Sequence, residues 1–548
     1  MTLTMSRPSA PAGARRGGAL TGTGTLLRFM LRRDRVRLPA WTLGIALLMA
    51  YFVTALRTVL ATPEDLRGMA GFSGSPIGAL FGGPGYGYDA LTIERFLAGQ
   101  YGLYILVGAG LMSVLTVTRH TRAEERSGRA ELVRAGVVGR HAQLTAALTL
   151  TTLMNALVAL LIAGLMSGSG FDGAGSLLFG AAVGAAGLAF AGVTAISAQL
   201  FEYPRAASGL AGAVLGAAFV LRGIGDMAAT HGSWLSWLSP IGWSQQTAAY
   251  VLDRWWPLGL SVAFAAVTAA LGYLLSARRD LAAGLVPPRP GPATAAPWLR
   301  SGAALAFRLQ RAQLIGWSLA LLVAGLSYGL FTQPVIDGFA DAPKELLAVM
   351  GGEEDMLAGF LGLMGLMMAF TVAVFAVLSL QGLRAEETEG RTEPVLATAV
   401  GRTGWLAANL AVTALGVLWL LFVAGLAMGV GAALSTGDAG LLGELVAGHV
   451  AHTPAVWLVL AVAALLYGAL PRALPLVWLI VVYGMIVGFF APILHIPDSA
   501  VNLSPFEHIG EYPLEDVSVP ATLALTALAV LVAGAALAAF RRRDIICT

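Results

Sequence analysis

The stretch RAEERSGRAELVRAGVVGR (Arg122–Arg140) returns in the second half of the chain as RAEETEGRTEPVLATAVGR (Arg384–Arg402). Twelve of the nineteen positions are identical, and the matches include glutamates as well as arginines. Both copies stand out because the chain is 57% hydrophobic and only 12% charged, whereas soluble proteins carry about 25% charged residues. The repeat therefore predicts a membrane protein that is built from two equivalent halves.

Three further pairs of short segments recur in the same order. The members of each pair are separated by nearly the same length of chain as the two charged stretches. The pairs are Pro204-Arg205-Ala206 with Pro471-Arg472-Ala473, Leu238-Ser239-Pro240 with Leu503-Ser504-Pro505, and Arg278-Arg279-Asp280-Leu281 with Arg542-Arg543-Asp544-Ile545. Four ordered matches at nearly one spacing indicate that the repeat extends over the whole chain.

Apolar runs set the fold class, because a helix needs about 20 apolar residues to cross a bilayer. Twelve runs qualify: 39–59, 98–118, 142–166, 174–199, 206–224, 256–277, 315–333, 358–381, 404–432, 445–468, 473–494 and 518–540. We predict an all-α polytopic membrane protein whose twelve transmembrane helices form two tandem six-helix halves. Six is an even number, so the two halves have the same, parallel orientation.

The domain boundaries follow from a proline-rich segment in the middle of the chain. Residues 285–298 contain five prolines, which disfavour helix and favour a semi-rigid linker. The first six-span half is then 1–284 and the second is 299–548. Each half begins with a mixed basic and apolar segment, Leu26–Leu38 or Leu305–Leu314, which we expect to lie in the inner membrane interface.

Arginine placement predicts the orientation. The N-terminal arm, 119–140, 278–314, 383–402 and the tail carry arginines, whereas the 334–357 and 495–517 loops are acidic. Basic loops stay in the cytoplasm, so an even number of spans places both termini inside the cell, in a bacterial inner or plasma membrane.

The repeated charged stretch is expected to form a short helix, a turn at Gly128 or Gly390, and a second short helix. Glu125 and Arg129 stand four residues apart, as do Glu387 and Arg391, so each pair can support an exposed helix. A solvated loop that follows the positive-inside rule requires arginines but no repeated pattern of glutamates. We therefore favour a docking element for a symmetric cytoplasmic partner, with Glu124, Glu125, Glu386 and Glu387 facing the docking groove.

These residues resemble the segment between the second and third spans of type-2 ABC exporter permeases. The pattern there is a glutamate, one or two residues, Gly, Thr or Arg, any residue, and a second glutamate. Glu125–Glu131 and Glu387–Glu393 fit it, with Arg where the family often has Thr. The resemblance implies a coupling helix that contacts a cytoplasmic ATPase, and membership of the fused twelve-span subgroup that exports polyketides and other antibiotics. The implied coupling residues are Arg122, Glu124, Glu125, Gly128, Arg129, Glu131, Arg384, Glu386, Glu387, Gly390, Arg391 and Glu393.

The energy source must lie outside this chain. A Walker A motif requires a lysine at the phosphates, and Lys344, the only lysine, falls in a predicted extracellular loop. ATP and Mg are expected on two copies of a separate ABC ATPase subunit, and no cofactor is expected here. Cys547 is the only cysteine, so a disulfide within the chain is excluded, and no cluster with metal-ligand spacing or catalytic triad is evident.

Few ionisable residues fall inside the predicted spans, where they are costly and often functional. Arg222 and Asp226, four apart near the outer end of the fifth span, either form a pair or place an arginine at the lipid headgroups. His449 and His452 could relay protons, but an interfacial position near the start of the tenth span is favoured. The glycine-rich segment Gly82–Gly85 predicts a flexible outer loop rather than a phosphate site, and 230–255 and 497–517 predict short helices.

The leading interpretation is the permease subunit of an exporter that moves hydrophobic or amphipathic, drug-like compounds out of the cell, with no nucleic-acid partner. A proton-coupled secondary transporter is the alternative, although it would need acidic residues in the middle of the spans. An intramembrane enzyme would need a clustered His, Asp or Ser constellation, which the sequence does not contain.

Overall fold

The computed structural model describes residues 18–60, 62, 66–67, 74, 76–287, 291–333, 356–494, 496–510 and 512–544. The loop that carries Lys344, the prolines at 288 and 290, and Cys547 lie outside these residues. The described residues form helices and connecting turns without a strand, and twelve of the helices are long and apolar enough to cross a membrane. The predicted all-α polytopic fold is confirmed. The chain separates into two compact units, Met1–Gly291 and Pro292–Thr548, and each contains six of the twelve candidate spans.

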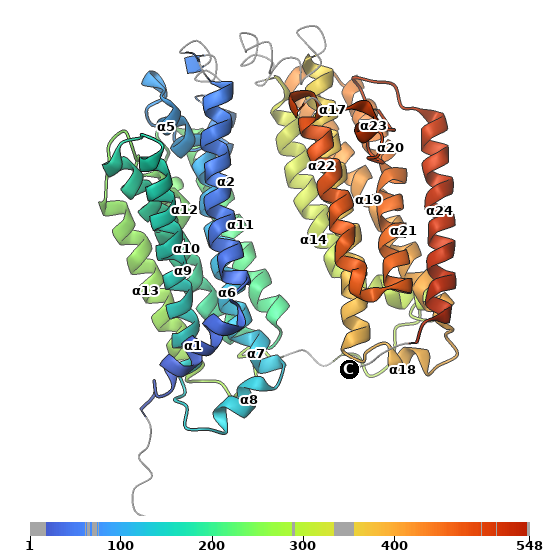
Figure 1. The fold of residues 1–548 in the computed structure, drawn as a ribbon, viewed down its shortest axis with the longest axis horizontal. Helices are drawn as coiled ribbons and strands as arrows, with labels where there is room; N and C mark the ends of the chain where they lie inside the picture. The colour runs from blue at the N-terminus through green and yellow to red at the C-terminus, as the bar shows by residue number, and fades with distance from the viewer. Residues whose placement is uncertain are drawn as a thin grey trace, which may run out of the picture. The chain divides into compact units, whose positions relative to one another are not determined.

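The first unit contains the helices drawn in blue and green (Figure 1). Its main helices are α1 (Thr23–Arg33), α2 (Arg37–Val59), α4 (Pro76–Phe81), α5 (Ile93–Phe96), α6 (Gly102–His120), α7 (Arg122–Arg126), α8 (Arg129–Arg134), α9 (Ala142–Gly168), α10 (Gly173–Leu200), α11 (Pro204–Ala228), α12 (Pro240–Gln245) and α13 (Trp256–Ser276). Three single turns complete it: η1 (Tyr88–Ala90), η2 (Leu97–Tyr101) and η3 (Ser236–Leu238).

The second unit repeats this plan in yellow to red. Its helices are α14 (Gly302–Leu330), α17 (Met356–Thr388), α18 (Glu393–Leu396), α19 (Arg402–Thr436), α20 (Gly440–Ala451), α21 (Thr453–Ala469), η4 (Pro471–Leu476), α22 (Val477–Leu494), α23 (Asp498–Val501) and α24 (Val519–Arg542).

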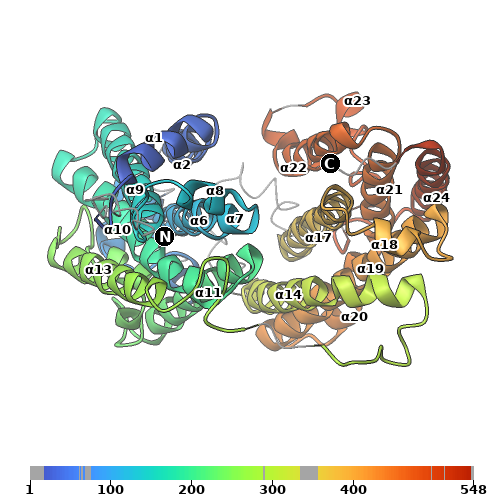
Figure 2. The same ribbon diagram turned by 90° about the horizontal axis from the view of Figure 1, so that it is seen from below.

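The fourth span forms the centre of the first unit. Helix α10 packs against α6, α9, α11 and α13, and Figure 2 shows it among these neighbours. Its glycines permit this close packing: a Cβ at Gly180 would collide with the Ala159 carbonyl on α9, and one at Gly187 would collide with Asn155. Small residues are the usual means of close helix approach in membranes, where lipid chains are as apolar as leucine. In the second unit α21 has the corresponding place, in contact with α17, α19, α22 and α24.

The two units begin differently. In the first, α1 ends at Arg33 and α2 starts at Arg37, so α1 lies across the end of α2 as a separate helix (Figure 1). Pro39 accounts for the break, because its ring would clash with the preceding turn of a continuous helix. In the second unit the predicted interfacial segment Leu305–Leu314 is part of one long helix, α14. The segment continues directly into the span there, because no proline interrupts Leu305–Leu330.

Candidate coupling site

The first charged stretch folds as the sequence predicts. Helix α7 ends at Arg126, Gly128 takes the left-handed conformation with φ 72°, and α8 follows. The second stretch turns in the same way at Gly390, also with φ 72°, between the end of α17 and α18. A Cβ is disfavoured at positive φ, which explains why glycine occupies both turns. In the first unit, α7 and α8 lie at the same end as α1 and opposite α5 (Figure 1).

Glu125 is buried rather than exposed, with 6% of its surface accessible. Arg279, just beyond α13, holds both of its carboxylate oxygens: Nη2 donates to Oε1 at 2.6 Å and Nη1 donates to Oε2 at 2.9 Å. Arg122, also buried, donates to the same Oε2 at 2.9 Å and to the carbonyls of Ala198 and Ala283. The carboxylate therefore sits between two guanidinium groups, which offset the cost of its burial.

The second unit contains the equivalent contact. Glu387 has 4% of its surface accessible, and Arg543 Nη2 donates to its Oε2 at 2.7 Å. The Tyr467 hydroxyl donates to the same oxygen at 2.5 Å. Arg543 also lies over the rings of Tyr467 and Phe540, 5.2 Å and 5.1 Å from their centroids. We refer to the Glu125–Arg279 and Glu387–Arg543 ion pairs as the two clasps.

The last arginine of each charged stretch makes a second equivalent contact. Arg140 Nη2 donates to the carbonyl of Ala277, the residue that caps the C-terminus of α13. Arg402 Nη1 donates to the carbonyl of Arg543, which caps the C-terminus of α24. Both contacts measure 2.9 Å. Each charged stretch is thus tied at two points to the end of the sixth span of its own unit.

The buried and exposed residues of the two stretches are not those that the sequence predicted. The expected Glu125–Arg129 and Glu387–Arg391 pairs do not form, because each glutamate is turned inward to its clasp. Glu124 is also buried, paired with Arg33 of α1, and the expectation that Glu124, Glu125 and Glu387 face a docking groove is wrong. Apart from Arg140 and Arg402, the charged residues whose described side chains are exposed are Arg126, Arg129 and Glu131 in the first stretch and Glu389, Arg391 and Glu393 in the second.

Glu386 and Arg384 are both partly exposed at the end of α17. Glu386 accepts two hydrogen bonds of 2.7 Å from Arg391, and the hydrogen bond and negative charge of Glu386 raise the pKa of Arg391. Arg391 also pairs with Glu389. Arg391 therefore remains charged at every physiological pH.

A second ion pair joins the end of α6 to Asp34, which follows α1. Arg119, near the end of α6, donates from Nε and Nη2 to the two carboxylate oxygens of Asp34, both at 2.7 Å. Burial alone would raise the pKa of Asp34, but the hydrogen bonds and charge of Arg119 outweigh it and hold the pKa below its ordinary value. Together with Arg33–Glu124, this pair fixes α1 against the charged stretch.

Arg222 and Asp226 form an ion pair inside the first unit, which decides between the two hypotheses for these residues. Arg222 Nη1 donates to Asp226 Oδ2 at 3.1 Å and to the carbonyl of Ala79 at 3.0 Å, and Nη2 bonds the carbonyl of Leu80. Ser236 donates to Asp226 Oδ1 at 2.6 Å. Both charged side chains are buried, so the pair holds α4 and η3 against α11 rather than reaching lipid headgroups.

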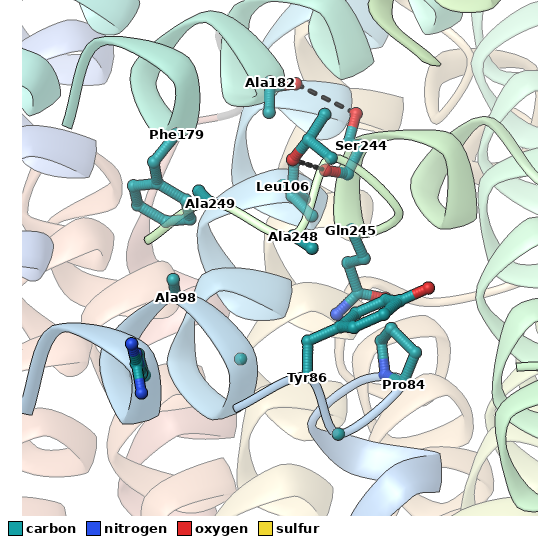
Figure 3. A pocket seen from close by; sticks show the side chains of 14 residues that line it. Pro84, Tyr86, Ala98, Leu106, Phe179, Ala182, Ser244, Gln245, Ala248 and Ala249 are labelled. Carbon is teal, nitrogen blue, oxygen red and sulfur yellow. Dashed lines mark hydrogen bonds between the residues drawn. The ribbon is translucent and has the colours of Figure 1, made fainter. Parts of the chain in front are cut away.

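The glycine-rich segment packs tightly against residues 244–249. Tyr86 stacks on His231 with ring centroids 4.4 Å apart, and its hydroxyl donates to Gln246 at 2.7 Å. Figure 3 shows Tyr86 and Gln245 side by side at a cavity of about 40 Å³. A cavity of this size holds a water molecule but not a phosphate-bearing ligand.

His449 and His452 are buried within the second unit, with 1% and 3% of their surfaces accessible. They lie where α20 meets α21, inside a continuous candidate span, Gly440–Ala469. Glu444 is exposed on α20 and makes no ion pair with either ring among the described contacts. Within the described ranges, no three His, Cys, Asp or Glu side chains are placed to hold a metal ion.

The clasps are the feature that inspection of the sequence missed. Glu125 matches Glu387 in one repeated segment, and Arg279 matches Arg543 in another. The glutamates and the arginines repeat at nearly the same spacing along the chain. This shared spacing was the signal in the sequence that each glutamate pairs with the arginine of its own unit.

Comparison with known proteins gives one family. The model described as "Multidrug efflux system permease Rv1217c, C-terminal domain" matches residues 24–275 and 299–541, which leaves out the proline-rich segment. The chain is also 39% identical over 562 residues to the multidrug efflux system permease protein Rv1217c of Mycobacterium tuberculosis, with 100% of each chain covered. This protein is a multi-pass membrane protein that belongs to the family of the multidrug efflux system permease Rv1217c.

Proposed function

We propose that the chain is the membrane-spanning permease subunit of an ATP-driven ABC exporter. It moves hydrophobic or amphipathic, drug-like compounds out of a bacterial cell across the inner or plasma membrane. The relative that covers its whole length is named a multidrug efflux system permease, which supports efflux of several compounds. ATP and Mg are held by two copies of a cytoplasmic ATPase subunit, since this sequence has no lysine in a Walker A context.

The twin clasps carry this proposal. Each joins a charged stretch, which exposes arginines and glutamates of both signs, to the end of the sixth span through a buried ion pair. A partner that binds the exposed residues and moves them would also pull on α13 or α24, because a buried charge is costly to separate from its partner. A loop that only obeys the positive-inside rule would not need a buried glutamate at the same place in both units.

The arrangement divides each stretch into two roles. Arg126, Arg129, Glu131, Arg391 and Glu393 form the exposed surface that the ATPase would contact. Arg122, Glu124, Glu125 and Glu387 are buried anchors that transmit the movement to the helices. Gly128 and Gly390 provide the turns that separate anchor from surface. With this surface in the cytoplasm, six spans per unit place both chain termini on the same side.

The apolar composition of the spans supports a hydrophobic substrate. Apart from Arg222 and Asp226, which neutralise one another, few charged residues lie within the membrane-spanning windows. A strongly charged solute would find few fixed counter-charges there.

A proton-coupled secondary transporter is the second candidate, because His449 and His452 are buried together in the tenth span. The deciding experiment uses proteoliposomes that contain the chain and an ABC ATPase subunit from the same organism. The exporter proposal expects dye accumulation to require ATP hydrolysis and to persist without a pH gradient. Transport driven by a pH gradient alone, with the ATPase omitted, would establish the secondary transporter instead.

A further inference from the structure

The second unit contains an open cavity of about 660 Å³ beside α21, α22 and α24, and its lining residues Leu479, Leu503 and Leu528 are exposed. Its walls are almost entirely apolar, with Val459 and Val462 on α21, and Leu525, Leu528 and Val532 on α24. None of the described lining residues is Asp, Glu, Lys or Arg. Small-molecule sites in proteins are typically about 300–1,000 Å³, mostly apolar, with a few placed polar groups.

In the first unit two aromatic side chains, Trp243 and Phe264, fill the equivalent place. The Leu-Ser-Pro repeat aligns Trp243 with His508, and the Arg-Arg-Asp repeat at the end of each sixth span aligns Phe264 with Leu528. The Trp243 and Phe264 rings pack edge to face, with centroids 5.5 Å apart. Trp243 Nε1 also donates to the carbonyl of Trp237 at 2.6 Å, which fixes the indole against α13.

Helix packing differs between the units at the same place. In the first unit a Cβ at Gly192 of α10 would collide with Thr268 of α13, so the two helices touch there. The Pro-Arg-Ala repeat aligns Gly192 with Val459, and the Arg-Arg-Asp repeat aligns Thr268 with Val532. Both valines line the cavity. Glycine on one helix allows the close approach seen in the first unit, and the second unit has no glycine at this place.

Two polar groups line the cavity. The Tyr483 hydroxyl donates to the carbonyl of Ala500 at 2.6 Å. His508 Nε2 contacts the carbonyl of Asn502 at 2.9 Å, and because a carbonyl only accepts, this nitrogen carries the proton. In the neutral ring Nδ1 is then a hydrogen-bond acceptor, and so is the Tyr483 oxygen.

We propose that this cavity binds an uncharged, aromatic, hydrophobic molecule, whose ring occupies the place that Trp243 fills in the first unit. The uncharged lining disfavours ionised ligands, and the two acceptors suit a ligand with one hydroxyl or N–H group. The site rests on the proposed function in one respect, since it names the class of compound that the exporter would carry. It also makes the two halves unequal: one binds the compound, while the other is closed by its own side chains.

The test uses 4-(hydroxymethyl)benzophenone, an uncharged two-ring photoprobe with one hydroxyl group, with the full chain in phosphatidylcholine nanodiscs and no ATPase present. Irradiation followed by peptide mapping should place the cross-links on α21, α22 and α24. The double variant His508→Trp/Leu528→Phe should reduce these cross-links by about tenfold or more, which corresponds to about 1.4 kcal/mol of binding. The single variant Leu528→Phe, a milder filling, should reduce them less.

The matched control is Leu531→Phe, which adds the same ring on α24 at a residue that is 70% exposed and does not line the cavity. It should leave cross-linking unchanged. The reverse variant Trp243→His/Phe264→Leu should create new cross-links on α10 and α13.

Undiminished cross-linking in both filled variants would overturn the proposal. So would a phospholipid that co-purifies with the chain and that the photoprobe cannot displace, because the occupant would then be a lipid. The readout is binding, so loss of ATP-driven export with intact cross-linking would count against the exporter proposal and leave this site standing.

Discussion

Arg543 donates a hydrogen bond to Glu387 across 2.7 Å, although 156 residues separate the two along the chain. The contact recurs in the first unit between Arg279 and Glu125, at 2.6 Å and a separation of 154 residues. In both cases the glutamate belongs to a charged stretch between two spans, and the arginine follows the sixth span. The ion pair therefore gives a contact on that stretch a direct route to a distant helix of the same unit.

Neutralising one member of the Glu387–Arg543 clasp should destabilise the protein more than neutralising both. Glu387→Gln leaves a partly buried guanidinium and Arg543→Gln leaves a buried carboxylate, and breaking a buried pair typically costs about 3–5 kcal/mol. In the double variant two neutral amides can bond each other, so we expect a coupling energy of about 0.5–3 kcal/mol. Thermal unfolding of the purified chain measures it.

The control for the clasp is Arg541→Gln, two residues away on α24 and exposed. It should change stability by less than about 0.5 kcal/mol. A double variant that is as unstable as the sum of the two single variants would show that the residues act independently.

Reversing the exposed charges of both stretches should weaken binding of the ATPase without unfolding the permease. Glu131→Lys/Glu393→Lys changes two exposed side chains, and a misplaced charge at an interface can cost several kcal/mol. Co-purification of the ATPase should fall by at least about tenfold, that is about 1.4 kcal/mol. Glu444→Lys, exposed on α20, is the control and should leave co-purification intact. Normal ATPase recovery with the double variant would leave these stretches as solvated loops.

The Arg222–Asp226 pair should behave as a structural pair within the first unit. Asp226→Asn leaves Arg222 charged and buried, so we expect a loss of about 3–5 kcal/mol of stability. Arg222→Met/Asp226→Asn should cost less than the sum of the two single changes, although Arg222 also binds the Ala79 and Leu80 carbonyls. Thermal unfolding of the four proteins measures the difference. Strict additivity would mean that the two side chains do not stabilise one another.

Acidification should weaken the contact between α1 and α6 that Asp34 and Arg119 form. The pKa of Asp34 is lower in the folded protein than its ordinary value. The stabilisation is therefore complete above the unfolded pKa, about 3.9, and is lost as the pH falls through the folded pKa. Asp34→Asn should lower the melting temperature at neutral pH and flatten its fall below about pH 4. An unchanged acid slope in this variant would assign the slope to other carboxylates.

Cys547 should be reached only from the cytoplasm. Twelve spans are an even number, so a cytoplasmic N-terminal arm requires a cytoplasmic C-terminus. A membrane-impermeant maleimide should label this single cysteine in inside-out vesicles and not in intact cells. Labelling of intact cells would place the C-terminus outside and reverse the proposed orientation.

Much of the architecture could be predicted because it depends on local physical requirements. A helix that crosses a bilayer must be apolar for about 20 residues, and such an apolar run can be recognised directly in the sequence. The turns at Gly128 and Gly390 were also predictable, since a glycine between two short charged helices marks the change of direction. The start of α14 was harder to predict from the sequence, because an arginine-bearing segment can be either a separate interfacial helix or the first turns of a span.

The sequence by itself determined the twelve spans, the twofold repeat and the two charged stretches, since each depends on composition or spacing along the chain. Only the tertiary structure decided which charged residues are exposed. Glu125 and Glu131 have the same chemistry and belong to the same short stretch, yet one is buried against Arg279 and the other faces outward. The difference arises because a charge can be buried only where another helix end supplies its partner. The distance between the glutamate and that helix end is set by the packing of the helices, not by their spacing along the chain.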